Sequence, residues 1–216
     1  MRYILIPVKD LTQAKQRLAE VMTQEERTLM AWTMLETTFA AARASSCAER
    51  IAVVTLYQPA AELARSCGME VIAETEQISE SASVDFGSRE VEQLGATAVL
   101  RLPIDLPLMT TAEIDQIFAH DGPGPSTVIV PSRDGTGTNA ILRRPGTLFA
   151  SQFGPHSLAK HLAAAARTRA NYEVIHLSGI ELDIDDPGDL REFLARGEGT
   201  KLCDLLIQMG IPERLG

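Results

Sequence analysis

Short apolar or β-branched runs alternate with amphipathic segments along most of this 216-residue chain. This alternation predicts an α/β fold with a mainly parallel sheet covered by helices on both faces, because parallel neighbours need a long crossover between them. The expected strands and extended segments are residues 3–8, 51–56, 69–73, 97–102, 126–131, 139–143, 172–177 and 181–184. The expected helices are residues 12–22, a helix after Thr23, residues 60–67 and 82–94, a helix from Thr110 to near His120, residues 157–168, and a helix opened by Asp186 and Pro187.

Two helix starts carry the capping-box pattern, in which a threonine precedes a glutamate by three positions. Thr23 stands in this relation to Glu26, and Thr110 to Glu113. Apolar residues at helical spacing share one face of a helix. The apolar face predicted for the helix after Thr23 consists of Leu29, Trp32, Phe39 and Ala40.

The alternation is interrupted where the strands at 126–131 and 139–143 flank a glycine-rich turn at 132–138. Two strands joined by a short turn predict an antiparallel insertion or edge strand, so the sheet is expected to be mixed. Residues 197–216 are predicted to form a final helix on the domain. We therefore expect a single domain over residues 1–216, with 197–216 as a C-terminal helical extension.

Composition limits the partners of the chain. A net charge of -9 argues against a nucleic-acid surface, which usually carries a basic face. No apolar run approaches the ~18 residues of a membrane span, and the first apolar stretch is too short for a signal peptide. Three widely scattered cysteines predict neither a disulfide framework nor a zinc site. We therefore expect a cytoplasmic protein with no nucleic-acid or membrane partner.

One carboxylate, Asp105, lies three residues after the end of the apolar strand at 97–102, and Pro107 comes two residues later. Ligands of open α/β sheets gather at the carboxyl ends of the strands, and hard divalent cations prefer oxygen ligands. Asp105 is therefore a candidate metal ligand, although a turn-forming aspartate before a proline would look the same.

Three cations, Lys9, Lys15 and Arg17, follow the first strand within nine residues. Placed on the loop and first turn after that strand, they could clamp a triphosphate. A solvated basic helix start is the alternative interpretation. No glycine-rich dinucleotide fingerprint and no P-loop accompanies them.

Two further carboxylates, Asp183 and Asp185, point to one face if residues 181–184 are extended. Two carboxylates on one face attract a cation or repel one another, whereas the neighbouring Asp186 is explained as the N-cap of a helix with Pro187 at its first position. The turn at 132–138 could turn its amides toward an anion or be a plain hairpin turn. Ser157 could bind an anion at a helix start or simply cap that helix.

Five motifs occur here in order: Pro-Val-Lys with Ala-Lys-x-Arg-Leu (7–18), Asp-Leu-Pro (105–107), Gly-Thr-Gly-Thr-Asn-Ala (135–140), Phe-Gly-Pro-x-Ser (153–157) and Asp-Ile-Asp (183–185). Together they resemble the 2-phospholactate guanylyltransferase family of deazaflavin coenzyme (F-420) biosynthesis, over about residues 3–190. The resemblance implies a nucleotidyltransferase fold related to the nucleotide-diphospho-sugar transferases and glycosyltransferase type A enzymes.

The resemblance also implies a reaction in which GTP and a small phosphorylated carboxylic acid give a guanosine-diphosphate-linked acid and pyrophosphate. The acid is 2-phospholactate, phosphoenolpyruvate or 3-phosphoglycerate, depending on the member. The oligomeric state does not follow from the resemblance, and a homodimer is one of the open possibilities.

The resemblance carries site roles onto matching positions. Catalytic roles fall on Asp105, Lys15 and Arg17. Nucleotide binding falls on Pro7, Val8, Lys9, Lys15, Arg17 and Asp105. Acceptor binding falls on Thr138, Gly154 and Ser157, and Mg²⁺ binding on Asp105, Asp183 and Asp185.

One region departs from the family pattern. Many members carry a Gly-Leu-Asn-type stretch at the start of the helix before the Asp-Leu-Pro strand, where this chain has Glu-Ser-Ala-Ser-Val-Asp at 80–85. We expect a divergent subgroup, with 3-phosphoglycerate as the hypothesised acid. Two other interpretations stay open, because fold does not fix function: a sugar-nucleotide or glycosyl transferase of the same fold, and a non-catalytic nucleotide-sensing module.

Overall fold

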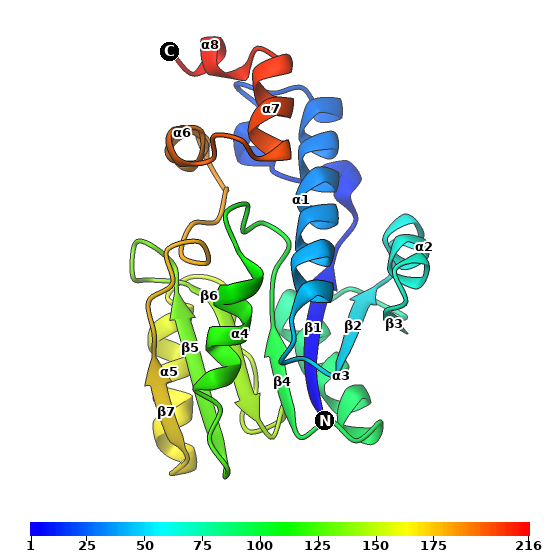
Figure 1. The fold of residues 1–216 in the computed structure, drawn as a ribbon, viewed down its shortest axis with the longest axis vertical. Helices are drawn as coiled ribbons and strands as arrows, with labels where there is room; N and C mark the ends of the chain where they lie inside the picture. Colours follow the sequence, from blue (N-terminus) through cyan, green and yellow to red (C-terminus); the bar gives the residue numbers. More distant parts are fainter.

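Seven strands form one mixed sheet in the order β3-β2-β1-β4-β6-β5-β7 (Figure 1). A computed structural model describes residues 1–216. The strands are β1 Arg2–Val8, β2 Arg50–Thr55, β3 Glu70–Ala73, β4 Ala98–Arg101, β5 Ser126–Pro131, β6 Thr138–Arg144 and β7 Asn171–Val174. Strands β1 to β4 are mutually parallel and β7 is parallel to β5, whereas β6 runs antiparallel to both of its neighbours. The α/β prediction with a mainly parallel, mixed sheet is confirmed.

Eight α-helices accompany the sheet. They are α1 Gln24–Ala44, α2 Gln58–Ser66, α3 Glu80–Gln93, α4 Thr111–Ala119, α5 Ser157–Thr168, α6 Pro187–Arg196, α7 Lys201–Gln208 and α8 Ile211–Leu215. Both predicted capping boxes are present at the starts of α1 and α4, and Asp186 caps α6 with Pro187 at its first turn. No helix of the chain is long and apolar enough to cross a bilayer.

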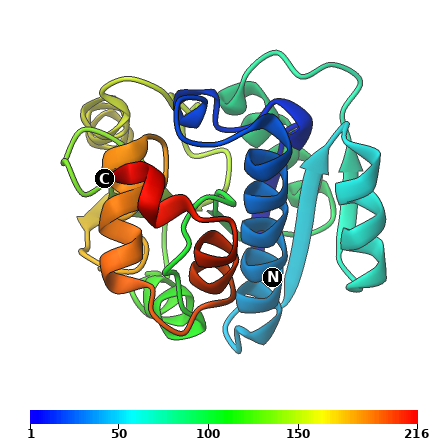
Figure 2. The same ribbon diagram turned by 90° about the horizontal axis from the view of Figure 1, so that it is seen from above.

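The two faces of the sheet are covered by different helices. Alternate residues of β1 point to opposite faces, so Ile4 and Ile6 pack with the buried side chains of α1 and α4, whereas Tyr3 and Leu5 pack with α3. Helix α3 approaches the sheet closely at Gly87, where a Cβ atom would lie only 2.4 Å from Val54 Cγ2. Helices α6, α7 and α8 gather beside α1 at one end of the molecule (Figure 2).

Three sequence predictions were wrong in detail. Residues 12–22 do not form a helix; they contain two 3-10 turns, Leu11–Gln13 and Gln16–Leu18, separated by Lys15 in a left-handed conformation (φ 52°). Residues 197–216, predicted to form one final helix, form the two helices α7 and α8. In α1, Leu29 is 46% exposed and Ala40 is also exposed, because the buried stripe instead follows residues such as Met30, Met34 and Phe39.

The predicted antiparallel insertion is β6, which lies inside the sheet between β4 and β5. Because β6 runs against β4, its amino end lies beside the carboxyl end of β4. The residues that follow β1 and β4 therefore share one edge of the sheet with Thr138 and Asn139 at the start of β6. This is the upper edge of the sheet in Figure 1.

Candidate functional site

Two cavities open at this edge and share part of their walls. The large cavity has a volume of about 580 Å³, within the range of roughly 300–1,000 Å³ common for ligand sites. The small cavity, about 290 Å³, lies against the loop that follows β1. Both are lined by Glu80, Arg101, Pro103 and Asp105. Asp105 therefore lies where the two cavities meet.

An ion pair network connects three distant parts of the chain at this junction. Lys15 Nζ donates to Asp105 Oδ2 at 2.8 Å and to Asp185 Oδ1 at 3.0 Å. The Lys15 side chain is 12% exposed, that of Asp105 25% and that of Asp185 48%. Arg17 Nη1 lies 3.8 Å from Asp185 Oδ2 with its side chain mostly in solvent. The left-handed backbone at Lys15 is part of the turn from which its amine reaches both carboxylates.

The neighbouring carboxylates have opposite electrostatic surroundings. Burial favours the neutral form of Asp105, but the Lys15 ammonium, with help from Arg101, holds its pKa below the usual value. Burial and the charge of Asp105 raise the pKa of Asp183 to about 6, and Asp185 adds to the rise. An amide hydrogen bond from Asn139 Nδ2 at 3.1 Å only partly offsets this. The ionised site therefore has more negative charge than its own cations compensate.

Metal binding was expected at Asp105, Asp183 and Asp185, and all three line the large cavity. As the side chains stand, no group of three or more His, Cys, Asp or Glu residues is arranged to hold a metal ion. The Lys15 ammonium occupies the space between two of the three carboxylates. The donor set nevertheless suits a hard divalent cation, because it offers only carboxylate oxygens. The metal assignment stays a prediction.

The three predicted acceptor residues, Thr138, Gly154 and Ser157, line the large cavity together. Gly154 has a φ of 106°, a region that favours glycine, in the loop that leads into α5. Ser157 is buried at the first position of α5 and has no side-chain hydrogen bond within the chain. Helix α5 begins without a side-chain cap, since His156 precedes it in a left-handed conformation.

His161 supports this wall from behind. Its Nε2 accepts a hydrogen bond from Gln152 N at 2.9 Å, so its Nδ1 carries the proton and donates to Thr138 Oγ1 at 3.0 Å. Burial and the nearby Arg143 and Arg101 lower the pKa of His161 to about 4. The imidazole is thus neutral at physiological pH and fixes Thr138 relative to the loop at 152–157. None of the sequence motifs includes this histidine.

The nucleotide-binding prediction divides between the cavities. Pro7, Lys9, Lys15 and Asp105 line the small cavity, and Arg17 lines the large one with the acceptor residues. Val8 lines neither; its side chain is buried in the core and its carbonyl accepts from Thr55 Oγ1. The structure thus brings all the predicted residues except Val8 to one composite site.

Sequence reasoning missed Arg101, Glu80 and Asn139. Arg101 ends β4 inside the site, and its Nη2 forms an ion pair with Glu80. Asn139 holds the segment before Asp183 against β6 by donating to the carbonyls of Ile180 and Glu181 at 2.9 and 3.0 Å. A charged residue within an apolar strand was a visible signal for Arg101. Asn139 stood inside the motif at 135–140 and Glu80 began the stretch at 80–85, but neither was given a role of its own.

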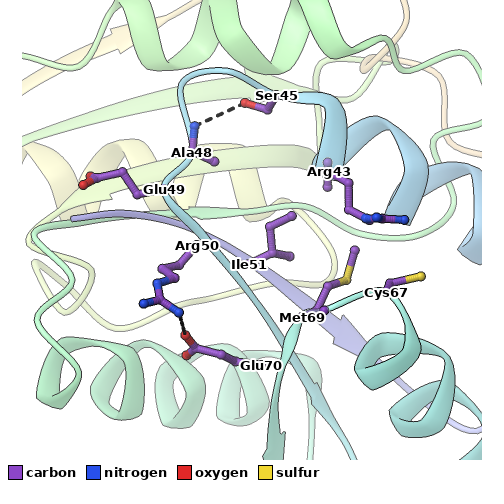
Figure 3. Close-up of a pocket in the computed structure, with 11 residues that line it drawn as sticks. Arg43, Ser45, Ala48, Glu49, Arg50, Ile51, Cys67, Met69 and Glu70 are labelled. Atoms are coloured by element: carbon purple, nitrogen blue, oxygen red, sulfur yellow. Dashed lines mark hydrogen bonds and ion pairs between the residues drawn. The ribbon is translucent and has the colours of Figure 1, made fainter.

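A third cavity, of about 350 Å³, lies at the opposite edge of the sheet, where β2 and β3 begin (Figure 3). It contains none of the predicted site residues. Its most prominent polar contact is an ion pair of Arg50 with Glu70 at 3.4 Å. The carboxyl edge therefore remains the candidate active site.

Comparison with known proteins identifies the family and supports the fold. The family model described as "Guanylyl transferase CofC like" matches residues 1–214. A phosphoenolpyruvate guanylyltransferase of Rubrobacter xylanophilus is 34% identical over 90% of this chain and 94% of its own length. A 2-phospho-L-lactate guanylyltransferase of Methanosphaerula palustris is 31% identical over 90% of this chain and 85% of its own length.

Solved structures show the same fold at low sequence identity. A protein of Desulfovibrio desulfuricans G20 described as a nucleotide-diphospho-sugar transferase superposes with a TM-score of 0.78 at 13% identity, covering 99% of this chain and 97% of its own. A Methanothermobacter nucleotidyl transferase gives a TM-score of 0.60 at 15% identity, covering 89% of this chain and 95% of its own. The nucleotidyltransferase-type fold expected from the sequence motifs is confirmed.

Proposed function

The chain belongs to the CofC-like guanylyl transferase family, and from that premise we propose that it transfers GMP from GTP to the phosphate of a small phosphorylated carboxylic acid, releasing pyrophosphate. The relatives named above act, by their names, on phosphoenolpyruvate and 2-phospho-L-lactate. One observation carries the proposal for this chain: the cavity lined by Lys9 and Lys15 and the cavity lined by Thr138 and Ser157 meet at Asp105. A phosphoryl group can therefore be shared between the two bound substrates.

The reaction needs no protein nucleophile. An oxygen of the acceptor phosphate attacks the α-phosphorus of GTP, a new P–O–P bond forms, and the bond between the α-phosphorus and the β-phosphate oxygen breaks. Pyrophosphate leaves with the electron pair of that bond. Catalysis then consists of holding the two phosphates in line and stabilising the charge on the reacting and leaving groups.

Lys15 is the cation best placed to act on the reacting phosphates. Its amine is fixed by Asp105 and Asp185, and the two carboxylates raise its pKa despite burial, so it stays protonated. Lys9 lines the small cavity and Arg17 the large one, so together they flank the junction. We assign these three side chains to the triphosphate and the departing pyrophosphate.

Asp105, Asp183 and Asp185 would hold Mg²⁺ when it enters with the nucleotide. The ion would supply positive charge to the phosphate oxygens. The raised pKa of Asp183, caused by burial and by Asp105, supports this role because an added cation would relieve the repulsion. Lys15 would then exchange part of its carboxylate contact for a phosphate oxygen.

Thr138, Gly154 and Ser157 would seat the carboxylate or phosphate of the acceptor. The free hydroxyl of buried Ser157 and the uncapped start of α5 both offer donors to an anion in the large cavity. Thr138 is held in place by His161. The loop that carries Gly154 closes the same wall.

Pyrophosphate release tests the proposal. The protein with Mg²⁺ is incubated with each of GTP, ATP, CTP and UTP, with and without 2-phospholactate, phosphoenolpyruvate or 3-phosphoglycerate. We expect release only with GTP and only when an acid is present. A nucleotide-sensing module would release none with any pair, and a glycosyl transferase would use a nucleotide-sugar donor and release no pyrophosphate. Either result would reject the proposal.

A further inference from the structure

The wall between the two cavities is built around one buried guanidinium. Arg101 and Glu80 line both cavities. The Arg101 side chain is 6% exposed, and Arg17 and Arg133, the other guanidinium groups of the large cavity, are 75% and 49% exposed. Arg101 is therefore the one guanidinium at the junction that is shielded from water, where a charge interaction is strongest.

The hydrogen bonding of Arg101 is incomplete. Its Nη1 donates to Asn139 O at 2.9 Å, and its Nη2 pairs with Glu80. Its Cζ lies over the Phe153 ring, 4.2 Å from the ring centroid. Its Nε is buried and has no partner. Buried polar groups are nearly always satisfied, but the unpartnered Nε alone does not indicate a ligand, because Arg143, away from both cavities, shares this feature. The distinguishing observation is that Arg101 lines both cavities.

The charge balance of the large cavity also favours a role for Arg101 in binding phosphate. Seven carboxylates line the large cavity, from Glu80, Asp105, Asp134, Asp183, Asp185, Asp186 and Asp189, against three guanidinium groups. A phosphorylated substrate would be repelled there unless buried positive charge meets it. Burial lowers the pKa of Arg101 to about 10, while Asp105 and Asp183 oppose the fall, so it stays charged at neutral pH.

We infer that Arg101 contacts the α-phosphoryl group as it passes between the cavities, and that Glu80 is the counter-ion that neutralises Arg101 until the nucleotide arrives. The inference rests on the proposed function. Glu80 is the first residue of α3, and its side chain is 31% exposed, so it can release the guanidinium without unpacking the core. A phosphate oxygen would replace the glutamate as the acceptor, and the planar fork of arginine suits that exchange.

A purely structural ion pair would behave differently, and the chain contains a matched example. Arg143 on β6 is also buried, also has an unpartnered Nε, and pairs with Asp85 on the same helix as Glu80 at 3.5 Å. Its guanidinium lies 5.6 Å from the Phe149 ring centroid. Neither Arg143 nor Asp85 lines either cavity. This second pair is the control for the first.

The experiment compares Arg101→Gln, Arg101→Lys and Glu80→Gln with Arg143→Gln and Asp85→Asn. Steady-state pyrophosphate release gives kcat and KM, and calorimetry gives the Kd for GTP without acid. We expect Arg101→Gln to lower kcat about a hundredfold, the scale of one lost transition-state donor, and Arg101→Lys to recover part of it. Glu80→Gln should tighten GTP binding about fivefold, and that gain should vanish in the Arg101→Gln background.

The controls should lower Tm without these kinetic and binding changes. The inference is overturned if Arg101→Gln keeps kcat within a factor of three of the unmodified chain, or if Glu80→Gln weakens GTP binding. Should Arg101→Gln fail to fold, Arg101→Lys and Glu80→Gln still decide the matter. If the unmodified chain releases no pyrophosphate, the proposed function fails. If the unmodified chain releases pyrophosphate but the Arg101 and Glu80 variants behave like the controls, only the inference about Arg101 and Glu80 fails.

Discussion

Replacing Lys15 by methionine removes the cation at the centre of the candidate site while keeping much of its volume. The amine lies 2.8 Å from Asp105 Oδ2 and 3.0 Å from Asp185 Oδ1. Its loss leaves three carboxylates of one cavity with Arg101 as their nearest buried cation. We expect the metal-free variant to be less stable than the unmodified chain.

The size of the loss follows from exposure. Breaking a buried ion pair costs about 3–5 kcal/mol, whereas a surface pair is worth about 0–1 kcal/mol. Asp185 is 48% exposed and behaves as a surface partner, while Asp105 is 25% exposed and takes most of the effect. We expect the lower end, about 3 kcal/mol at pH 8. For a chain of this length that corresponds to a fall in Tm of roughly 6–12 °C.

The deficit should depend on pH in a defined direction. In the unmodified chain burial raises the pKa of Asp105, but Lys15 lowers it by a larger amount, so the net pKa is depressed. Folding therefore favours the carboxylate, and its contribution to the free energy of unfolding is lost only as pH falls through that depressed pKa. Without Lys15 the folded pKa of Asp105 rises above its unfolded value. Such a group loses stability as pH increases, so the gap between variant and unmodified chain should be widest at pH 8 and narrow toward pH 5.

Thermal unfolding from pH 5 to pH 8, with and without Mg²⁺, measures both effects. Mg²⁺ should raise the Tm of Lys15→Met more than that of the unmodified chain, because a divalent cation replaces the missing charge. Lys201→Met is the control, since Lys201 pairs with Glu36 through a 70% exposed side chain. A Lys15→Met deficit no larger than that of the control, or one equal at pH 5 and pH 8, would refute the reasoning.

Three further predictions follow from the same geometry. Burial and Asp105 raise the pKa of Asp183 to about 6, so this carboxyl costs stability progressively as pH rises from its unfolded pKa of about 4 through about 6. Asp183→Asn should therefore raise the Tm of the metal-free protein at pH 8 by the equivalent of about 1–3 kcal/mol, should raise it by less as pH falls to 5 and below, and should abolish stabilisation by Mg²⁺. Ser157→Ala should raise the KM for the acid about tenfold with little change in the KM for GTP, and an unchanged KM for the acid would leave Ser157 as a helix-start residue only. Burial lowers the pKa of His161 to about 4, so this histidine should contribute up to about 3 kcal/mol to the free energy of unfolding, which is lost as pH falls from 6.5 toward 4. Urea unfolding of His161→Gln should show a flatter dependence of this free energy on pH in that window, and an equal slope in both proteins would count against the prediction.

The local parts of the fold were predictable because their causes are local. The capping boxes at Thr23 and Thr110 and the Asp186-Pro187 start of α6 depend on residues within one turn, and all three form as predicted. Strand positions followed from short apolar runs between turn signals. The placement of β6 inside the sheet depends on pairing with distant strands, which no short pattern contains.

The helix predicted for residues 12–22, after β1, was wrong for a different reason. Residues 12–22 carry cations at a spacing that resembles a helix start, but Lys15 instead adopts a left-handed turn and pairs with carboxylates 90 and 170 residues away. Tertiary charge pairing overrides local propensity there. Functional sites are where such conflicts are expected, since residues are selected for the geometry of the site rather than for the local structure.

The sequence predicted many of the residues of the candidate site but not how its two cavities are arranged. The sequence motifs identified Asp105, Lys15 and Ser157, but nothing in the sequence showed that two cavities meet at Asp105 or that Arg101 and Glu80 form the wall between them. Val8 was assigned to the site because it stands in a motif with Lys9. In a strand, neighbouring side chains point to opposite faces, and Val8 faces the core.

The central claim is that Asp105 lies at the point of phosphoryl transfer, and its amide variant tests this most directly. Product formation from GTP and each acid is followed by mass spectrometry together with pyrophosphate release, for the unmodified chain and for Asp105→Asn, with circular dichroism to confirm folding. We predict equal amounts of pyrophosphate and a guanosine-diphosphate-linked acid from the unmodified chain. Asp105→Asn should keep the fold and lose on the order of a thousandfold or more in rate. A folded Asp105→Asn protein with near-normal turnover would contradict the account.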